Sequence, residues 1–285
     1  MQKLLAELLE FGILNIDKPS GPTSFGVVEY ILKKLKLRKA SHFGTLDPKV
    51  TGVLPIALNR ACKLTGYFLG SDKEYIGIMR LHEDVSLEKL KEKINEKFLG
   101  KIKQTPPVKS RVKRQERERE IHEFELLEVD GKDILFRVKC EGGTYIRKLI
   151  DDLGTALGIG AHMLELRRIK AGIFSEDDEN FVNLYDFDKA DEKELRKIIL
   201  PAEEAIKKKF KTIQVKESEI SRLYTGKQIF QEDIIDKSKI KSIEGDVVGV
   251  FSKEKFIGMY RVINKGKIFA KSEFVMQPVK KQNNL

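Results

Sequence analysis

The sequence has 285 residues, of which 41% are hydrophobic, and a formal net charge of +10 at pH 7. This length suits one large domain with a smaller one, and no apolar run approaches the roughly 20 residues that a membrane-spanning helix needs. The N-terminus is too acidic for a signal peptide, so we expect a cytoplasmic protein that does not contact a membrane. The basic surplus suits a polyanionic partner, although thermophilic proteins are also rich in lysine and glutamate.

Cysteines and histidines do not form a metal-binding pattern in this sequence. Cys62 and Cys140 lie far apart without a Cys-x-x-Cys motif, and the four histidines do not cluster. The sequence also lacks a glycine-rich nucleotide-binding loop. We therefore expect no metal, no disulfide scaffold and no cofactor.

The first elements lead to a proline-rich turn. Residues 1–10 are predicted to form an amphipathic helix, and residues 12–19 a strand that ends in the turn Pro19-Ser20-Gly21-Pro22. Thr23 or Ser24 can cap the helix that follows, whose apolar residues recur at helical spacing. Lys18, at the end of the strand, is either a solvated turn residue or a support for the next loop.

The stretch from Ser41 to Gly52 is predicted to be a tight loop. Asp47 precedes Pro48, which disfavours helical backbone at the aspartate, and Gly44 and Gly52 permit sharp turns on either side. Such a loop presents one carboxylate in a fixed direction. An ordinary Asp-Pro turn is the alternative interpretation.

A basic stretch interrupts the middle of the chain. Before it, strands are predicted at 53–58 and 73–81, and helices at 60–68 and 85–98. Residues 100–120 then contain a Pro-Pro break without a clear period. Their basic side chains suit either contact with an RNA backbone or a solvated face. They include Lys109, Arg111, Lys113 and Arg114.

The second half continues as mixed structure and ends in a β-rich unit. Strands are predicted at 121–129 and 133–140 around an Asp130-Gly131 turn, and another at 164–171. A helix is predicted to open at residues 142–149 and run to Leu157, and a further helix to cover 195–208 around Pro201. Short strands from residue 212 onward suggest a compact barrel.

Five strings resemble the motifs of the TruB family of pseudouridine synthases, in the expected order. They are Ile16-Asp17-Lys18-Pro19-Ser20-Gly21-Pro22-Thr23-Ser24, Gly44-Thr45-Leu46-Asp47-Pro48-Lys49-Val50-Thr51-Gly52, Lys73-Glu74-Tyr75, Gly143-Thr144-Tyr145-Ile146-Arg147-Lys148-Leu149, and Gly160-Ala161-His162-Met163-Leu164-Glu165-Leu166-Arg167-Arg168. The resemblance implies isomerisation of uridine to pseudouridine in RNA without a cofactor. It also implies an α+β fold. A catalytic domain (1–209) would hold a mixed, mainly antiparallel sheet flanked by helices, and residues 210–285 would form a small β-barrel PUA RNA-binding domain.

The resemblance assigns roles to individual residues. Asp47 would be the catalytic carboxylate, Arg147 its charge partner, and Tyr75 a stacking or proton-transferring group. Whether Asp47 acts as a nucleophile or as a base stays open. Supporting roles at the extruded nucleotide would fall to His42, Leu166 and Lys18.

Two strings favour the archaeal and eukaryotic dyskerin branch of the family, which is the catalytic subunit of H/ACA guide-RNA particles. They are Ile78-Met79-Arg80-Leu81-His82 and residues 104–114. Membership implies an H/ACA guide RNA, a substrate RNA and three partner proteins. The three are a zinc-ribbon-like protein, a small β-barrel protein and a kink-turn-binding protein. Ser41 and Phe43 depart from the family, which usually has glycine and a small residue there.

Three alternatives remain beside guided catalysis. A stand-alone enzyme would modify the tRNA T-arm directly. A non-catalytic RNA-binding factor for ribosome assembly would keep the fold without needing the Asp47, Tyr75 and Arg147 set. A PUA-bearing RNA methyltransferase would need a cofactor-binding glycine loop or knot motif, and we find neither.

Overall fold

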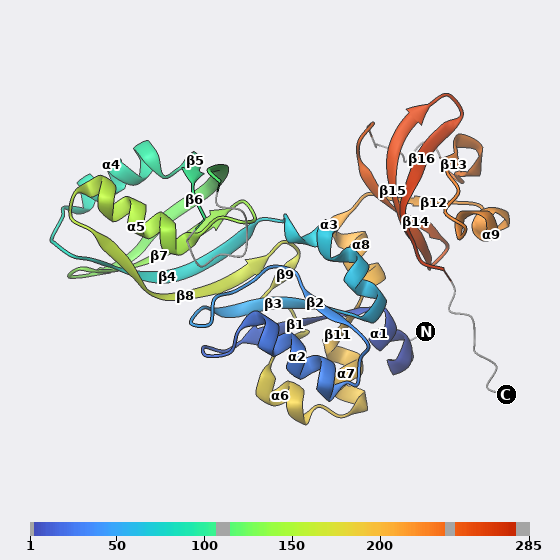
Figure 1. Cartoon of the computed structure of the whole chain (residues 1–285), viewed down its shortest axis with the longest axis horizontal. Coiled ribbons are helices and arrows are strands. Elements are labelled where there is room, and N and C mark those ends of the chain that lie inside the picture. The colour runs from blue at the N-terminus through green and yellow to red at the C-terminus, as the bar shows by residue number, and fades with distance from the viewer. Residues whose placement is uncertain (1–2, 107–114, 237–242, 278–285) are drawn as a thin grey trace. The chain divides into compact units, whose positions relative to one another are not determined.

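A large mixed sheet forms the centre of residues 1–201 in the computed structural model, which describes residues 3–106, 115–236 and 243–277 (Figure 1). The chain divides into two units, residues 1–201 and 202–285, and each is described by itself. Within the described ranges, none of the helices is both long and apolar enough to cross a membrane.

The sheet of the first unit has the strand order β10-β1-β3-β8-β4-β7-β6-β5, and β11, β2 and β9 add to β1, β3 and β8. Its strands pair antiparallel except at β1–β10 and β3–β8, so the predicted mixed, mainly antiparallel sheet is confirmed. The strands are β1 (Gly12–Lys18), β2 (Ala40–His42), β3 (Thr51–Leu58), β4 (Lys73–Leu81), β5 (Gly100–Gln104), β6 (Arg117–Asp130), β7 (Asp133–Cys140), β8 (Ala161–Ala171), β9 (Phe174–Ser175), β10 (Phe181–Asn183) and β11 (Ile199–Pro201).

Helices α4 and α5 cover one face of the β4 half of this sheet (Figure 1). Helix α5 turns Leu149 and Leu153 into a core that also holds Leu90 of α4 and Phe136 of β7, because apolar residues recur every three or four positions. The helices of this unit are α1 (Leu5–Glu10), α2 (Ser24–Lys34), the 3₁₀ helix η1 (Asn59–Leu64), α3 (Thr65–Leu69), α4 (Leu87–Lys97), α5 (Ile146–Leu157), α6 (Leu184–Lys189) and α7 (Glu192–Ile198).

The two halves of the sheet meet at a narrow seam between β3 and β8. The parallel register there consists of Thr51 opposite Arg167 and Gly52 opposite Arg168. A Cβ atom on Gly52 would lie 2.2 Å from the carbonyl oxygen of Arg168, and the φ angle of Gly52 is +98°. Only glycine fits this crossing without strain.

Two predicted segments are corrected. The predicted helix over 195–208 is wrong, because Pro201 cannot donate a backbone hydrogen bond and favours extended backbone before it. Residues Ile199–Pro201 instead pair with β1 as strand β11. Residues 100–120 are also more regular than predicted. Strand β5 and the start of β6 occupy both ends of this stretch, where alternate side chains are buried.

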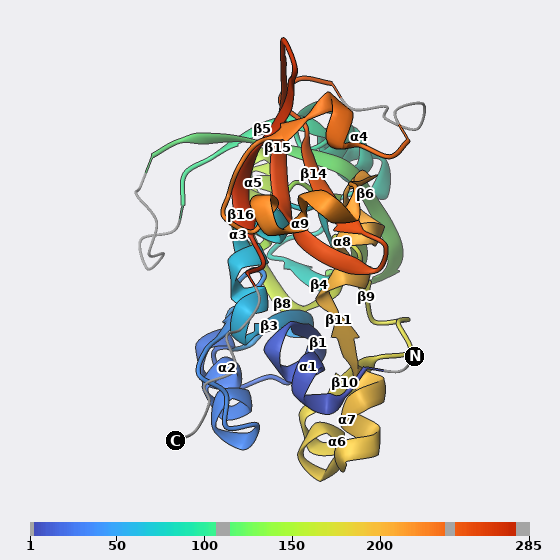
Figure 2. The same ribbon diagram turned by 90° about the vertical axis from the view of Figure 1, so that its right-hand side faces the viewer.

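The second unit contains a five-stranded sheet in the order β12-β14-β15-β16-β13. Figure 2 shows that β14, β15 and β16 curl, which is compatible with a PUA-like domain. The predicted short strands are confirmed, whereas the PUA assignment and the boundary at residue 209 stay predictions. The elements are α8 (Ala202–Lys209), β12 (Thr212–Gln214), the 3₁₀ helix η2 (Glu217–Glu219), α9 (Ile220–Leu223), β13 (Ile229–Phe230), the 3₁₀ helix η3 (Gln231–Asp233), β14 (Val247–Ser252), β15 (Lys255–Lys265) and β16 (Ile268–Val275).

Helix α5 can lie close to β8 because Gly154 lacks a side chain. A Cβ atom there would lie 2.1 Å from the backbone nitrogen of Ala161, whereas a Cβ on Gly66 in α3 would meet nothing within 4 Å. We predict that Gly154→Ala lowers the free energy of unfolding by about 3 kcal/mol or more, the upper end for overpacking. Gly66→Ala, the matched control, should leave it unchanged or raise it by about 0.5–1 kcal/mol. Urea unfolding measures both, and equal effects would contradict this account.

Candidate active site

Asp47 lies on a loop that is fastened on its N-terminal side by Ser24. The backbone N–H of Leu46 donates to the Ser24 hydroxyl oxygen at 2.7 Å, and that hydroxyl donates to the Leu46 carbonyl at 2.9 Å. The N–H of Val50 donates back to the carbonyl of Asp47 at 3.0 Å, which closes a turn at Pro48. The local backbone of the carboxylate is therefore fixed by hydrogen bonds on both sides.

Lys18 holds the same loop from below. Its Nζ donates to the carbonyl oxygens of Pro19 at 2.8 Å, Pro48 at 3.0 Å and Val50 at 2.8 Å. Three acceptors match the three N–H groups of an ammonium ion. Burial lowers the pKa of Lys18, and the negative charge of Asp47 opposes that change. Lys18 is fully buried, so the alternative of a solvated turn residue is excluded.

Arg147 and Asp47 form an ion pair although 100 residues separate them in the sequence. The Nη2 of Arg147 lies 2.6 Å from Oδ2 of Asp47. Arg147 is in the first turn of α5, and the side chain of Gln104 binds both the N–H and the carbonyl of Tyr145 just before it. The two side chains are 60% and 46% exposed, so the charged pair can be reached by a ligand.

Tyr75 and Leu166 lie on the neighbouring strands β4 and β8. Tyr75 of β4 stands opposite Arg168 of β8, and Leu166 stands opposite Gly77 two residues further along β4. Both side chains belong to the core of the first unit. Burial raises the pKa of the Tyr75 hydroxyl, and the charge of Arg168 opposes the rise. The negative charge of Asp47 also acts on Tyr75, so the two groups share one electrostatic environment.

His42 ends strand β2 on the approach to the loop. Its Nδ1 accepts a hydrogen bond from the N–H of Gly44 at 3.3 Å, so the neutral ring carries its proton on Nε2. Burial lowers the pKa of His42, and the charge of Arg168 lowers it further. The next residue, Phe43, points into an aromatic cluster with Phe68 and Phe174. Its departure from the family therefore changes the interior rather than the exposed side of the loop.

Three buried residues of the site have no role in the sequence analysis. Ser24 appears there only as a possible helix cap. Gln104 falls in the stretch that seemed irregular, and Arg168 appears only as the last letter of a motif. Arg168 is 1% exposed and donates to the carbonyls of Val53 and Gly44. Strand β8 also carries His162, Glu165, Arg167 and Lys170, so nothing in the sequence alone marks Arg168 as the buried cation.

The predicted basic residues Lys109, Arg111, Lys113 and Arg114 lie outside the described residues. Their contact with an RNA backbone therefore stays a prediction. Among the residues that are described, no group of three or more metal-binding side chains is placed to hold a metal ion.

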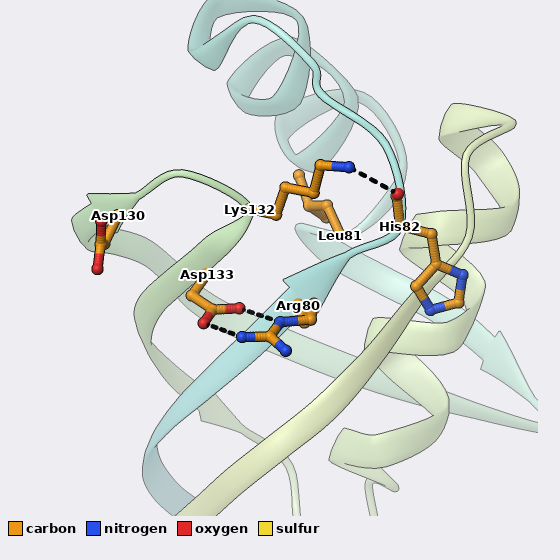
Figure 3. Close-up of a pocket in the computed structure, with 6 residues that line it drawn as sticks. All are labelled: Arg80, Leu81, His82, Asp130, Lys132 and Asp133. Atoms are coloured by element: carbon orange, nitrogen blue, oxygen red, sulfur yellow. Dashed lines mark hydrogen bonds and ion pairs between the residues drawn. The ribbon is translucent and has the colours of Figure 1, made fainter.

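A pocket of 530 Å³ lies at the other end of β4 (Figure 3). There Arg80 forms a two-pronged ion pair with Asp133, and Lys132 donates to the carbonyl of His82. His82 also meets His162 at 2.9 Å between ring nitrogens. Five residues of strand, or about 17 Å, separate Arg80 from Tyr75. The pocket is thus distinct from the Asp47 site, and it contains the end of the 78–82 string.

The Lys18 contacts predict a large and local loss of stability on substitution. Each buried carbonyl left without a donor costs about 1–3 kcal/mol, so Lys18→Met should lower the free energy of unfolding by several kcal/mol. Lys49→Met is the matched control, because Lys49 is exposed on the same loop. Denaturant unfolding at pH 7 compares the two variants. Equal stability of both would mean that the three Lys18 hydrogen bonds do not hold the loop.

Comparisons with known proteins agree with this geometry. Residues 32–146 match the N-terminal domain of TruB family pseudouridylate synthases, and residues 147–207 match the tRNA pseudouridylate synthase B C-terminal domain. The probable tRNA pseudouridine synthase B of Methanocaldococcus jannaschii is 44% identical over 264 residues, covering 87% of this chain and 78% of the relative. That of Pyrococcus horikoshii is 42% identical over 277 residues, covering 94% and 80%.

Solved structures resemble both units of the chain. The matching chain in the crystal structure of a Cbf5–Nop10–Gar1 complex has a TM-score of 0.86 and 38% identity, covering 96% of this chain and 88% of its own length. A chain of an H/ACA RNP bound to a substrate RNA containing 2′-deoxyuridine has a TM-score of 0.83 and 36% identity, covering 97% and 88%. The matched families, the close relatives and the Asp47 loop lead to one conclusion: the chain belongs to the TruB family of pseudouridine synthases, which are RNA isomerases.

Proposed function

We propose that Asp47 is the catalytic carboxylate and that Arg147 orients it and balances its charge. The observation that carries this proposal is the 2.6 Å contact between these two exposed, oppositely charged groups above a rigid loop. The reaction breaks the bond between ribose C1′ and uracil N1 and forms one between C1′ and C5. The C5 proton is released and N1 gains a proton, so no oxidant or cofactor is consumed.

Tyr75 and Leu166 are proposed to line the site of the uracil ring. They lie on adjacent strands and on the same face of the sheet, and burial and the negative charge of Asp47 both raise the pKa of Tyr75. An aromatic face can stack on a base, and a buried hydroxyl can donate or accept a proton near the new bond. His42, neutral through burial, would contact the nucleotide from the β2 side.

The target uridine has to leave its stack to reach Asp47. Extrusion costs a few kcal/mol and least for an unpaired base. We propose that the basic side chains Lys109, Arg111, Lys113 and Arg114 contact the RNA backbone, since phosphate neutralisation supplies most non-specific affinity. Residues 210–285 are proposed to act as a PUA-type RNA-binding domain, supported by the curled sheet.

We infer that an H/ACA guide RNA selects the substrate RNA, with ribosomal RNA as the main target. The support is the likeness to a Cbf5–Nop10–Gar1 complex and to an H/ACA RNP, which extends over 96% and 97% of this chain. Counterparts of Nop10 and Gar1, and a kink-turn-binding protein, would be its protein partners in the cytoplasm. The second candidate is guide-independent modification of tRNA, which the names of the relatives favour.

Removing the carboxylate charge of Asp47 tests the catalytic assignment. We predict that Asp47→Asn reduces tritium release from RNA labelled at uridine C5 by at least about 10³-fold, as expected for a group that acts on the reacting atoms. The dissociation constant for RNA should stay within about threefold, because the change is isosteric and local. Asp84→Asn, at an exposed loop position, is the control and should retain full activity. Retained turnover in Asp47→Asn would refute the assignment.

Guide dependence is tested with one set of purified components. We compare the chain alone with the chain plus its partner proteins, each without and with guide RNA. Every mixture is incubated with a ribosomal RNA fragment and with a tRNA. We expect conversion of the ribosomal target only when the matching guide is present, and its loss when the guide sequence is scrambled. Guide-independent conversion restricted to the tRNA T-arm would favour the second candidate. Salt concentration must be fixed, because RNA affinity depends on it steeply.

A further inference from the structure

Arg167 and Arg168 are neighbours on β8, yet their surroundings are opposite. Arg167 is half-buried and bonded to the carboxylates of Asp17 and Glu176. Arg168 is 1% exposed, and the acceptors that it meets within the described residues are neutral. A buried cation without a carboxylate partner is costly unless its donors are well used. The contacts of Arg168 therefore indicate what it does.

Two of these contacts bracket the catalytic loop. The Nε of Arg168 donates to the carbonyl of Val53 at 2.8 Å, and Nη2 donates to the carbonyl of Gly44 at 3.1 Å. Gly44 precedes Asp47 and Val53 follows it. The planar guanidinium presents its donors in a fixed fork, so it sets the spacing of these two carbonyls. A lysine at this position could bond to them only one at a time or with poorer geometry.

Arg168 also lies across from Tyr75. The two residues are opposite each other in the β4–β8 register, and the positive charge of Arg168 opposes the rise that burial causes in the pKa of the Tyr75 hydroxyl. A residue that only fixed the loop would need no more than the hydrogen bonds to the Gly44 and Val53 carbonyls. The position opposite Tyr75 is additional, and it links the hydroxyl to the loop that carries Asp47.

The chemistry of the guanidinium limits what the hydroxyl beside it can do. A guanidinium has donors and no acceptor, so toward Arg168 the Tyr75 hydroxyl can only accept, through its oxygen. The proton of the hydroxyl is then available to a different partner. The adjacent permanent cation also favours any negative charge that develops on that oxygen.

We propose that Arg168 is a positioning residue for pseudouridine formation, which aims the Tyr75 hydroxyl at the base site and holds it in register with the Asp47 loop. This inference rests on the proposed roles of Asp47 and Tyr75. In this role Arg168 does not contact the substrate. Its effect should therefore appear in the chemical step rather than in RNA binding.

A double-mutant cycle under single-turnover conditions tests the inference. The set is the unchanged chain, Arg168→Lys, Tyr75→Phe and the double variant, in the fully assembled system that supports turnover. We expect Arg168→Lys to slow conversion at least tenfold, with the RNA dissociation constant within threefold. In the Tyr75→Phe background the same change should slow conversion by a clearly smaller factor, because the part of its effect that passes through the hydroxyl is lost and only the part that passes through the loop carbonyls remains. Arg167→Lys, the matched control, should convert RNA at the unchanged rate.

The possible failures can be told apart. A Tyr75→Phe chain with an unchanged rate would overturn the proposed role of Tyr75, and this inference with it. In a second outcome, Tyr75→Phe slows conversion, and the double variant is slowed by the product of the two single factors. That result would overturn this inference but not the role of Tyr75, since Arg168 would then act independently of the hydroxyl. A loss confined to RNA affinity would also overturn it.

A second measurement needs no change at Arg168, in case that variant does not fold. Side-chain NMR of the ¹⁵N-arginine-labelled chain without RNA compares the unchanged protein with Tyr75→Phe. We expect the Arg168 guanidinium signals to shift and their protons to exchange faster, while those of Arg167 stay in place. Unchanged Arg168 signals would overturn the proposal.

Discussion

The site depends on backbone carbonyl oxygens that two buried cations hold in place. Lys18 gathers the carbonyls of Pro19, Pro48 and Val50, and Arg168 those of Gly44 and Val53. An irregular loop cannot satisfy its carbonyls by a sheet or helix ladder, and unpaired buried groups are costly. The cations solve this difficulty, and the loop carbonyls in turn solvate the buried charges. The result is a loop rigid enough to aim one carboxylate.

The same arrangement also shapes the electrostatics of the site. Positive charge lies beneath the loop at Lys18 and Arg168 and beside it at Arg147, while Asp47 faces outward at 46% exposure. A polyanionic substrate approaching Asp47 would otherwise be repelled by the carboxylate. The surrounding cations offset that repulsion. The basic groups and the carboxylate therefore form one site of mixed charge.

Sequence reasoning reached most of the fold and part of the site, for identifiable reasons. Strand 73–81 was predicted with its exact bounds, and alternate residues from Tyr75 to Leu81 are buried in the structure. The segment around Pro201 was wrong because helical spacing was weighed above the proline. Motifs pointed to Asp47, Tyr75 and Arg147 as site residues, and the structure joins Asp47 and Arg147 in an ion pair. Arg168 could not be found in this way, since its partners depend on how β3 and β8 are aligned, and sequence does not state that register.

The seam at Gly52 has a mechanical consequence. The register joins β3 to β8 through only two residue pairs, Thr51 with Arg167 and Gly52 with Arg168. Asp47 lies on one side of this join, and the helix that bears Arg147 packs on the other. A bend at the join would therefore change the distance between these two charges.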